Sequence, residues 1–136
     1  MSVIYLTHGS AKKDPLQASK KGVYPFELYT ARPLVRFMNR CKTARVNWAI
    51  LSLEHGIWFP YQKHSWYDVN IYKIDNAKVE YLISNFDHSL KDFKEIWFYY
   101  NSSRFYKIYQ KILSSNKLKD RIKLFSNIHM IDSPRY

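Results

Sequence analysis

The residues best suited to chemistry follow an apolar run near the middle of the chain. Residues 46–51 form a short, mostly apolar run, as expected of a buried strand. Ligands bind outside the carboxyl ends of the strands in an open α/β sheet. The aromatic-rich segment 57–67 would then form a wall or lid over that crevice. The small, polar and titratable residues that follow the run are Ser52, Glu54, His55 and Gly56.

A second polar cluster follows an expected strand at residues 3–6. It contains His8, Gly9, Ser10, Lys12 and Lys13. Backbone N–H groups of a turn after Ser10, together with the two lysines, would suit an anion. A histidine beside a serine or carboxylate can act as a general base near neutral pH. Ser10 or Ser52, activated by His8 or His55, are alternative nucleophiles, and no motif chooses between them.

Strand-like and helix-like segments alternate along the chain, so the sequence predicts one α/β domain over residues 1–136. We expect a three-layer, Rossmann-like sandwich with four mostly parallel strands in the order 2-1-3-4 and helices on both faces. The crevice would lie between strands 1 and 2 or between strands 1 and 3. The predicted strands are 3–6, 46–51, 95–100 and 122–125, and residues 69–72 could form a further extended segment.

The helices are predicted from caps and apolar spacing. One begins near Thr30, has Pro33 in its first turn, and carries a buried stripe. That stripe consists of Leu34, Phe37, Met38 and Cys41, which makes the cysteine a core residue rather than a nucleophile. A second helix is capped by Asp75 or Asn76, and a third by residues 101–103. Residues 14–27 are expected to form a surface loop with at most one helical turn.

Positive charge distinguishes this chain and is unevenly distributed. The formal net charge is +11, and residues 1–45 hold nine Lys and Arg against two acids. Such a surface favours a polyanionic partner, although lysines also serve solubility alone. Arg32, Arg36 and Arg40 recur along one helix face, where they could follow a phosphate backbone or simply be solvated. Without a long apolar segment or signal peptide, a cytoplasmic location is expected.

Three segments resemble motifs of a family of small domains from microbes and phages. Residues 50–57, Pro60 and the pair at 67–68 resemble its iLSxxyGll-P-PYd pattern. Residues 28–30 resemble its LYtS segment, and residues 7–13 stand where it has a CSKKK-like motif. The YaaA peroxide-stress family and the core domain of archaeosine synthase are more distantly similar. Gly9 replaces the usual Cys, His55 an aromatic residue and Trp66 a proline, so thiol chemistry is not expected here.

The resemblance implies an α/β fold and a role connected with DNA or modified nucleobases. It also implies a pocket that includes Tyr29, Gly56, Tyr67 and Asp68. Combined with the residue patterns, the candidate catalytic residues are Ser10, Ser52, His55 and Asp68. The candidate binding residues are His8, Gly9, Lys12, Lys13, Tyr29, Arg32, Arg36, Arg40, Gly56, Tyr67 and Asn101.

The leading hypothesis is a nucleic-acid-associated domain whose crevice holds a nucleotide or base. A small-molecule hydrolase or transferase acting on an anionic substrate is the second. The third is a non-catalytic homodimer formed through the aromatic segment 57–67. The sequence predicts no metal site, cofactor or membrane contact, and it leaves open whether the protein is an enzyme.

Overall fold

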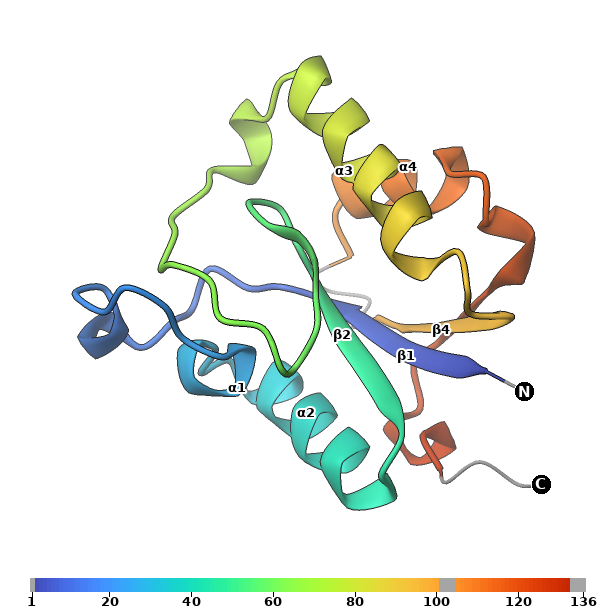
Figure 1. Cartoon of the computed structure of the whole chain (residues 1–136), viewed down its shortest axis with the longest axis horizontal. Coiled ribbons are helices and arrows are strands. Elements are labelled where there is room, and N and C mark those ends of the chain that lie inside the picture. Colours follow the sequence, from blue (N-terminus) through green and yellow to red (C-terminus); the bar gives the residue numbers. More distant parts are fainter. Residues whose placement is uncertain (1, 101–104, 133–136) are drawn as a thin grey trace.

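A five-stranded mixed sheet forms the centre of the molecule (Figure 1). The computed structural model describes residues 2–100 and 105–132. The sheet order is β3-β2-β1-β4-β5, and all neighbours except β3 run parallel. The strands are β1 (Val3–His8), β2 (Asn47–Ser52), β3 (Gly56–Trp58), β4 (Glu95–Tyr99) and β5 (Ile122–Phe125).

The four predicted strands are present, and their relative order matches the predicted one. The predicted strand count was wrong because β3 adds a short antiparallel edge strand beside β2. Only three residues long, β3 gives no alternating pattern that a sequence reading could detect. It forms because the chain reverses within a tight turn after Ser52.

The helices lie on the two sides of the sheet, with α2 on one side and α3 and α4 on the other (Figure 1). The predicted stripe of α2 is buried, and Pro33 lies in the first turn of that helix. Thr30 was wrong as the cap, because Ala31 occupies that position. The helices are α1 (Pro25–Leu28), α2 (Arg32–Ala44), α3 (Asn76–Leu90) and α4 (Lys107–Ser115).

Side-chain caps explain the N-terminus of α3 but not that of α4. Asp75 caps α3 as predicted, since its carboxylate accepts a hydrogen bond from Lys78 N at 2.8 Å. The predicted cap of α4 was wrong, because the cap position is Tyr106 and residues 101–104 lie outside the described part of the chain. The extended segment expected at 69–72 is instead partly a turn of 3-10 helix, η2 (Ile71–Lys73). No helix in the described residues combines the length and apolarity that crossing a bilayer requires.

The strand order places a reversal between β1 and β4. The chain passes from β1 outward to β2 and β3, and then returns to the other side of β1 to form β4. Connections therefore leave the carboxyl ends of β1 and β4 in opposite directions, which opens a space above these two strands. Open α/β sheets bind ligands at this kind of switch point.

Candidate functional site

A cavity of about 620 Å³ lies at the carboxyl ends of β1 and β4. Its volume falls in the range of small-molecule and nucleotide sites. It corresponds to the predicted crevice between strands 1 and 3, one of the two alternatives. Its walls are Thr7, His8, Gly9, Ser10, Ala11, Lys12, Ala31, Pro33, Leu34, Val69, Asn70, Ile71, Tyr72, Tyr99, Tyr106 and Tyr109.

His8 ends β1 and contributes an imidazole to the cavity wall. Its Nδ1 lies 2.8 Å from the Gly9 carbonyl oxygen. A carbonyl can only accept a hydrogen bond, so Nδ1 carries the proton and Nε2 of the neutral ring holds a lone pair. Among the described residues, no group hydrogen-bonds Nε2. The ring stacks on Tyr109 with a centroid distance of 4.4 Å, which fixes its orientation.

Burial lowers the pKa of His8 below its ordinary value of 6.5, opposed by the hydrogen bond to Gly9. The unfolded chain therefore binds a proton on His8 at higher pH than the folded protein does. We expect the free energy of unfolding to fall as the pH drops below about 6.5 and the loss to level off below the folded pKa.

His8→Gln should lose less stability than wild type when urea unfolding is compared between about pH 7.5 and pH 5. The pKa of His64 is also lowered, first by burial and then by His55, so His64→Gln is the control that measures its share. Equal losses in wild type and His8→Gln would contradict a buried, neutral His8.

The outer wall of the cavity comes from residues 69–72 rather than from the expected segment 57–67. Asn70 holds this wall in shape, because its side chain accepts a hydrogen bond from Tyr72 N at 2.9 Å. The Tyr72 ring is 82% exposed and meets Tyr106 edge to face at 6.2 Å. An exposed ring at the mouth of a cavity can stack on a planar ligand at little cost in side-chain order.

Gly9 stands between the cavity and a buried pair of tyrosine hydroxyls. Tyr29 and Tyr67 hydrogen-bond to each other through their hydroxyl oxygens. Burial is the first reason that both pKa values are raised. A Cβ at position 9 would lie 2.9 Å from the Tyr29 hydroxyl and 3.0 Å from that of Tyr67. The predicted Gly9, Tyr29 and Tyr67 thus do come together, but the two tyrosines lie behind the cavity wall.

Ser52 lies beside the same tyrosine pair and is fully buried. Its Oγ accepts hydrogen bonds from Glu54 N at 3.2 Å and from His55 N at 3.0 Å, which shapes the turn into β3. Ser52 therefore hydrogen-bonds to the backbone of His55 and not to its ring. A side chain without exposed surface in these surroundings organises the turn and does not line the cavity.

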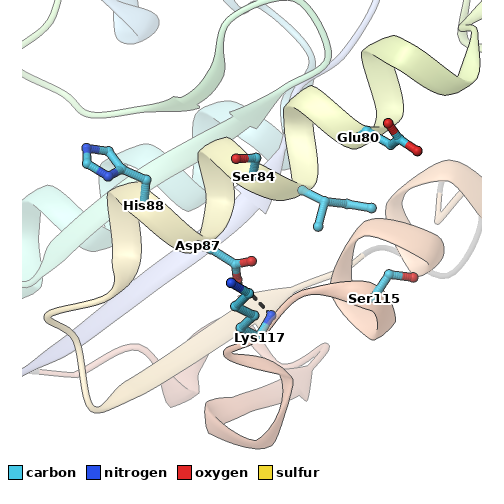
Figure 2. A pocket seen from close by; sticks show the side chains of 7 residues that line it. Glu80, Ser84, Asp87, His88, Ser115 and Lys117 are labelled. Carbon is cyan, nitrogen blue, oxygen red and sulfur yellow. Dashed lines mark hydrogen bonds between the residues drawn. The ribbon is translucent and has the colours of Figure 1, made fainter.

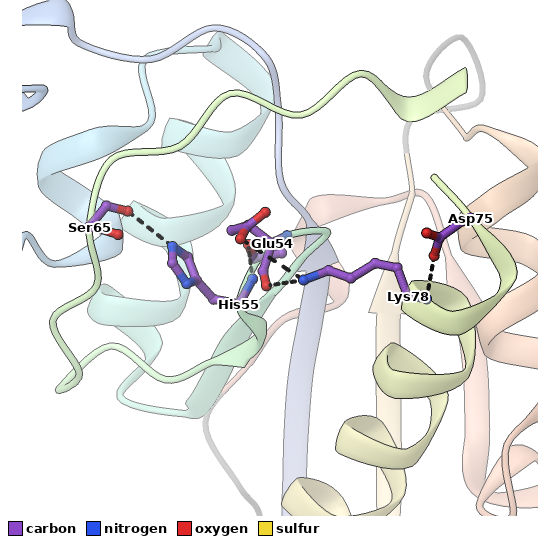
Figure 3. A network of polar contacts seen from close by, with 6 residues as sticks. Glu54, His55, Ser65, Asp75 and Lys78 are labelled. Carbon is purple, nitrogen blue, oxygen red and sulfur yellow. Dashed lines mark hydrogen bonds and ion pairs between the residues drawn. The ribbon is translucent and has the colours of Figure 1, made fainter. Parts of the chain in front are cut away.

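The His55 ring packs away from the cavity. Its Nε2 lies 3.0 Å from the Ser65 carbonyl oxygen (Figure 3). The ring also stacks on His64, with a centroid distance of 4.4 Å. On the other side of this turn, Lys78 Nζ donates to the Glu54 carbonyl at 2.8 Å and so ties the turn to α3 (Figure 3). These contacts hold the β2–β3 turn between the 59–66 segment and α3.

The two lysines after Ser10 have different surroundings. Lys12 is exposed and lines the cavity, where it can meet an anion. Lys13 Nζ lies 4.2 Å from the centroid of the Tyr67 ring, a cation–π contact. Burial lowers the pKa of Lys13, while the charge of Asp68 opposes the shift. Ser10 lines the cavity, and its Oγ accepts from Lys12 N at 3.3 Å.

The remaining candidates lie away from the cavity or outside the described chain. Asp68 is exposed and absent from the cavity wall, and Asn101 lies outside the described residues. Gly56 has a positive φ of 74° at the start of β3, where a Cβ would lie 2.3 Å from Asn85 Oδ1. A structural requirement therefore explains this glycine. Burial raises the pKa of the Cys41 thiol far above its ordinary value, as expected for a core cysteine.

The arginine row on α2 is split by the tertiary structure. Arg32 and Arg36 are exposed. Arg40 is half-buried, and its Nε donates to the Ile131 carbonyl at 2.8 Å. Arg40 thus holds the C-terminal segment against α2, which leaves the first two arginines as candidates for phosphate contact.

A second hollow of about 500 Å³ lies between α3 and the end of α4 (Figure 2). Glu80 and Asp87 line it together with His88 and Lys117, so it offers an anion no net attraction. Asp87 Oδ1 already accepts a hydrogen bond from Lys117 N at 2.8 Å. Across residues 2–100 and 105–132, no three His, Cys, Asp or Glu side chains gather as metal ligands would.

Sequence reasoning missed the tyrosines of the cavity. Tyr72 lies in a segment expected to be extended, and Tyr99 ends a strand whose residues were expected to be core. Tyr106 and Tyr109 flank the start of α4, and Tyr109 was recognised only as part of an apolar stripe. The available signal was the count of 12 tyrosines in 136 residues, which does not reveal which ones converge.

Compared with protein-family models, curated proteins and solved structures, the chain matches none.

Proposed function

We propose that the protein binds a nucleotide in the β1–β4 cavity and associates with nucleic acid. The observation that carries the proposal is the composition of the cavity wall, which combines four tyrosines with Lys12 at the switch point of the sheet. Tyrosine rings stack on bases of any sequence, and a lysine supplies attraction for phosphate. The net charge of +11 favours the same class of ligand.

The fold supports this placement of the ligand. We assign a Rossmann-like, three-layer arrangement, because the strand order reverses beside β1 and helices lie on either side of the sheet. The N-terminal turn of α2 contributes Ala31, Pro33 and Leu34 to the cavity. The positive end of its dipole therefore faces the same space as Lys12 and adds to the attraction for a phosphate.

Tyr72→Ala should weaken nucleotide binding by about 1–3 kcal/mol, or about 5- to 150-fold, because stacking on one ring is lost. The matched control is Tyr81→Ala, which removes a 51% exposed tyrosine from α3 that does not line the cavity. Calorimetric titration of both variants with the four common ribonucleoside and deoxyribonucleoside monophosphates checks this. The proposal fails if wild type binds none of them, or if both tyrosine variants bind equally to wild type.

Association with nucleic acid predicts salt-dependent binding of oligonucleotides, with log K falling by about 0.7–0.9 per neutralised phosphate. Arg32→Ala/Arg36→Ala tests whether the α2 row contributes. Arg40 is left intact because removing its bond to Ile131 would also loosen the C-terminal segment. An unchanged salt slope in this double variant would remove the row from the interface.

His8 supports a second candidate function, in which the cavity is the active site of a hydrolase or transferase. Its neutral ring presents at the cavity wall an Nε2 that no residue in 2–100 or 105–132 hydrogen-bonds, as a general base requires. Incubation of the bound nucleotide with wild type and His8→Gln, followed by chromatography, distinguishes the two. Conversion by wild type alone favours the enzyme, whereas an unaltered nucleotide with both proteins favours a binding domain.

A further inference from the structure

Two pairs of aromatic rings stack on the surface outside the cavity. Tyr24 and Phe26 have centroids 5.4 Å apart and planes inclined by 7°. Phe59 and Tyr61 repeat the arrangement at 5.5 Å and 8°. In each pair the outer ring is exposed, with 59% of Phe26 and 72% of Tyr61 accessible. We call these four residues the ring platform.

The two pairs belong to segments that are joined directly. Val23 and His64 form an antiparallel bridge with N–H···O distances of 2.9 and 3.0 Å. The turn at 59–62 accordingly lies beside α1 (Figure 1). Gln62 closes this turn, because its Oε1 accepts from Phe59 N at 3.0 Å. The half-buried inner rings thus hold the outer rings in fixed positions, which reduces the entropy that a ligand must overcome.

The two segments that carry the ring platform are mainly basic. Residues 15–26 and 55–67 contain no acid, and they contribute Lys20, Lys21 and Lys63. Lys63 Nζ lies 5.1 Å from the centroid of the Tyr24 ring, so the charge adjoins the stack itself. The nearest acid along the chain is Glu27, whose carboxylate already accepts a hydrogen bond from Tyr24 N at 2.9 Å.

We propose that the ring platform binds single-stranded nucleic acid by stacking bases on Phe26 and Tyr61. Exposed ring faces bordered by lysines are what non-specific single-strand binding uses, because every base has a π-face and every nucleotide a phosphate. A duplex hides its base faces, so the platform discriminates against it. The lysines add nothing to the affinity for an uncharged protein partner, whereas they attract a polyanion, which favours the nucleic acid.

The ring platform is separate from the cavity and lies within reach of it along one strand. Five residues lead from Phe26 to Ala31 in the cavity wall, a span of at most about 17 Å. One strand of nucleic acid can therefore lie on the platform while one of its bases enters the cavity. The platform proposal stands without the cavity proposal, because it uses different residues.

The test is fluorescence anisotropy with a short labelled oligothymidylate, the matching oligouridylate and a duplex of the same length. Phe26→Ala/Tyr61→Ala should weaken binding of either single strand by at least about tenfold and leave duplex binding nearly unchanged. Tyr81→Ala is again the matched control. The side chains of Phe26 and Tyr61 are largely exposed, so the double variant is expected to remain folded, as its far-ultraviolet circular dichroism would show.

A second variant addresses the charge. Lys20→Ala/Lys21→Ala/Lys63→Ala should reduce the slope of log K against log salt by up to about 2 for a single strand. Unchanged single-strand binding in the aromatic double variant would overturn the proposal. So would a change of mass in solution caused by that variant without any oligonucleotide binding by wild type, because the rings would then form a contact between two copies of the chain.

The two proposals fail separately. Mononucleotide affinity depends on the cavity and should be the same in Phe26→Ala/Tyr61→Ala as in wild type. Loss of single-strand binding in this variant, with mononucleotides not bound by any protein, would keep the ring platform and reject the cavity. If wild type binds mononucleotides and Phe26→Ala/Tyr61→Ala binds oligonucleotides as wild type does, the cavity proposal is kept and the ring platform is rejected.

Discussion

Trp58→Ala is expected to lower the free energy of unfolding by about 3–5 kcal/mol, as for other fully buried large aromatic residues. The Trp58 side chain has no exposed surface and packs edge to face on Tyr29 and His55. Its Nε1 donates to the Gln62 carbonyl at 2.9 Å, so the variant also leaves that oxygen without its partner. Urea denaturation monitored by circular dichroism measures the change.

Trp58→Phe is the matched control, because it keeps most of the buried apolar surface while it removes the hydrogen bond and leaves a smaller cavity than alanine does. We expect it to cost about 1–2 kcal/mol. The same pair tests the hypothesis of a homodimer through segment 57–67. Because Trp58 is buried within the chain, its replacement should not change the mass in solution of the folded protein. A loss below about 1 kcal/mol together with a changed mass would show that Trp58 lies at an interface instead.

Gly56→Ala should lower the free energy of unfolding by about 2–4 kcal/mol. The φ of 74° alone costs a residue with a Cβ about 1–2 kcal/mol. The new Cβ would also meet Asn85 Oδ1 at 2.3 Å, although this oxygen accepts a hydrogen bond from Ile57 N at 2.8 Å. Moving Asn85 away would break that bond and loosen β3 from α3.

Gly22→Ala is the control for Gly56→Ala. Gly22 does not have the positive φ of Gly56, and its Cβ would lie 3.2 Å from Lys63 Cβ, so a backbone shift of a few tenths of an ångström relieves the contact and a loss below about 1 kcal/mol is expected. Nucleotide affinity separates the structural role of Gly56 from the binding role that the sequence suggested. The folded Gly56→Ala protein should bind mononucleotides as wild type does, because Gly56 does not line the cavity. A selective loss of affinity at unchanged stability would restore the binding role.

Local patterns were sufficient for most of the fold. The strands β1, β2, β4 and β5 can be recognised in the sequence because each is a short, bounded and mostly apolar run. The stripe of α2 and the Asp75 cap of α3 are likewise determined within one or two helical turns. Strand β3 and the cap of α4 were not predicted, because three residues are too few to show a period and the Tyr106 side chain makes no capping hydrogen bond.

The candidate site was predictable in place but not in composition. Parallel strands bring their carboxyl ends to one edge, so His8, Gly9 and Ser10 could be assigned to a crevice from the order of elements alone. The aromatic segment 57–67 looks from its composition like the lid of that crevice. In the structure it turns toward α1 through the Val23–His64 bridge, and residues 69–72 cover the cavity instead. Long-range backbone pairing of this kind has no local signature.

The sequence by itself determined an α/β chain, the residues that end its first strand, and the excess of positive charge that favours an anionic partner. Only the tertiary structure decided which polar groups face open space. The side chains of Ser52 and Arg40 hydrogen-bond to the backbone, while Lys12 and Tyr72 line the cavity. The physical reason is that a side chain's type fixes what it can bind, whereas burial and competing partners from distant segments fix whether it is free to do so.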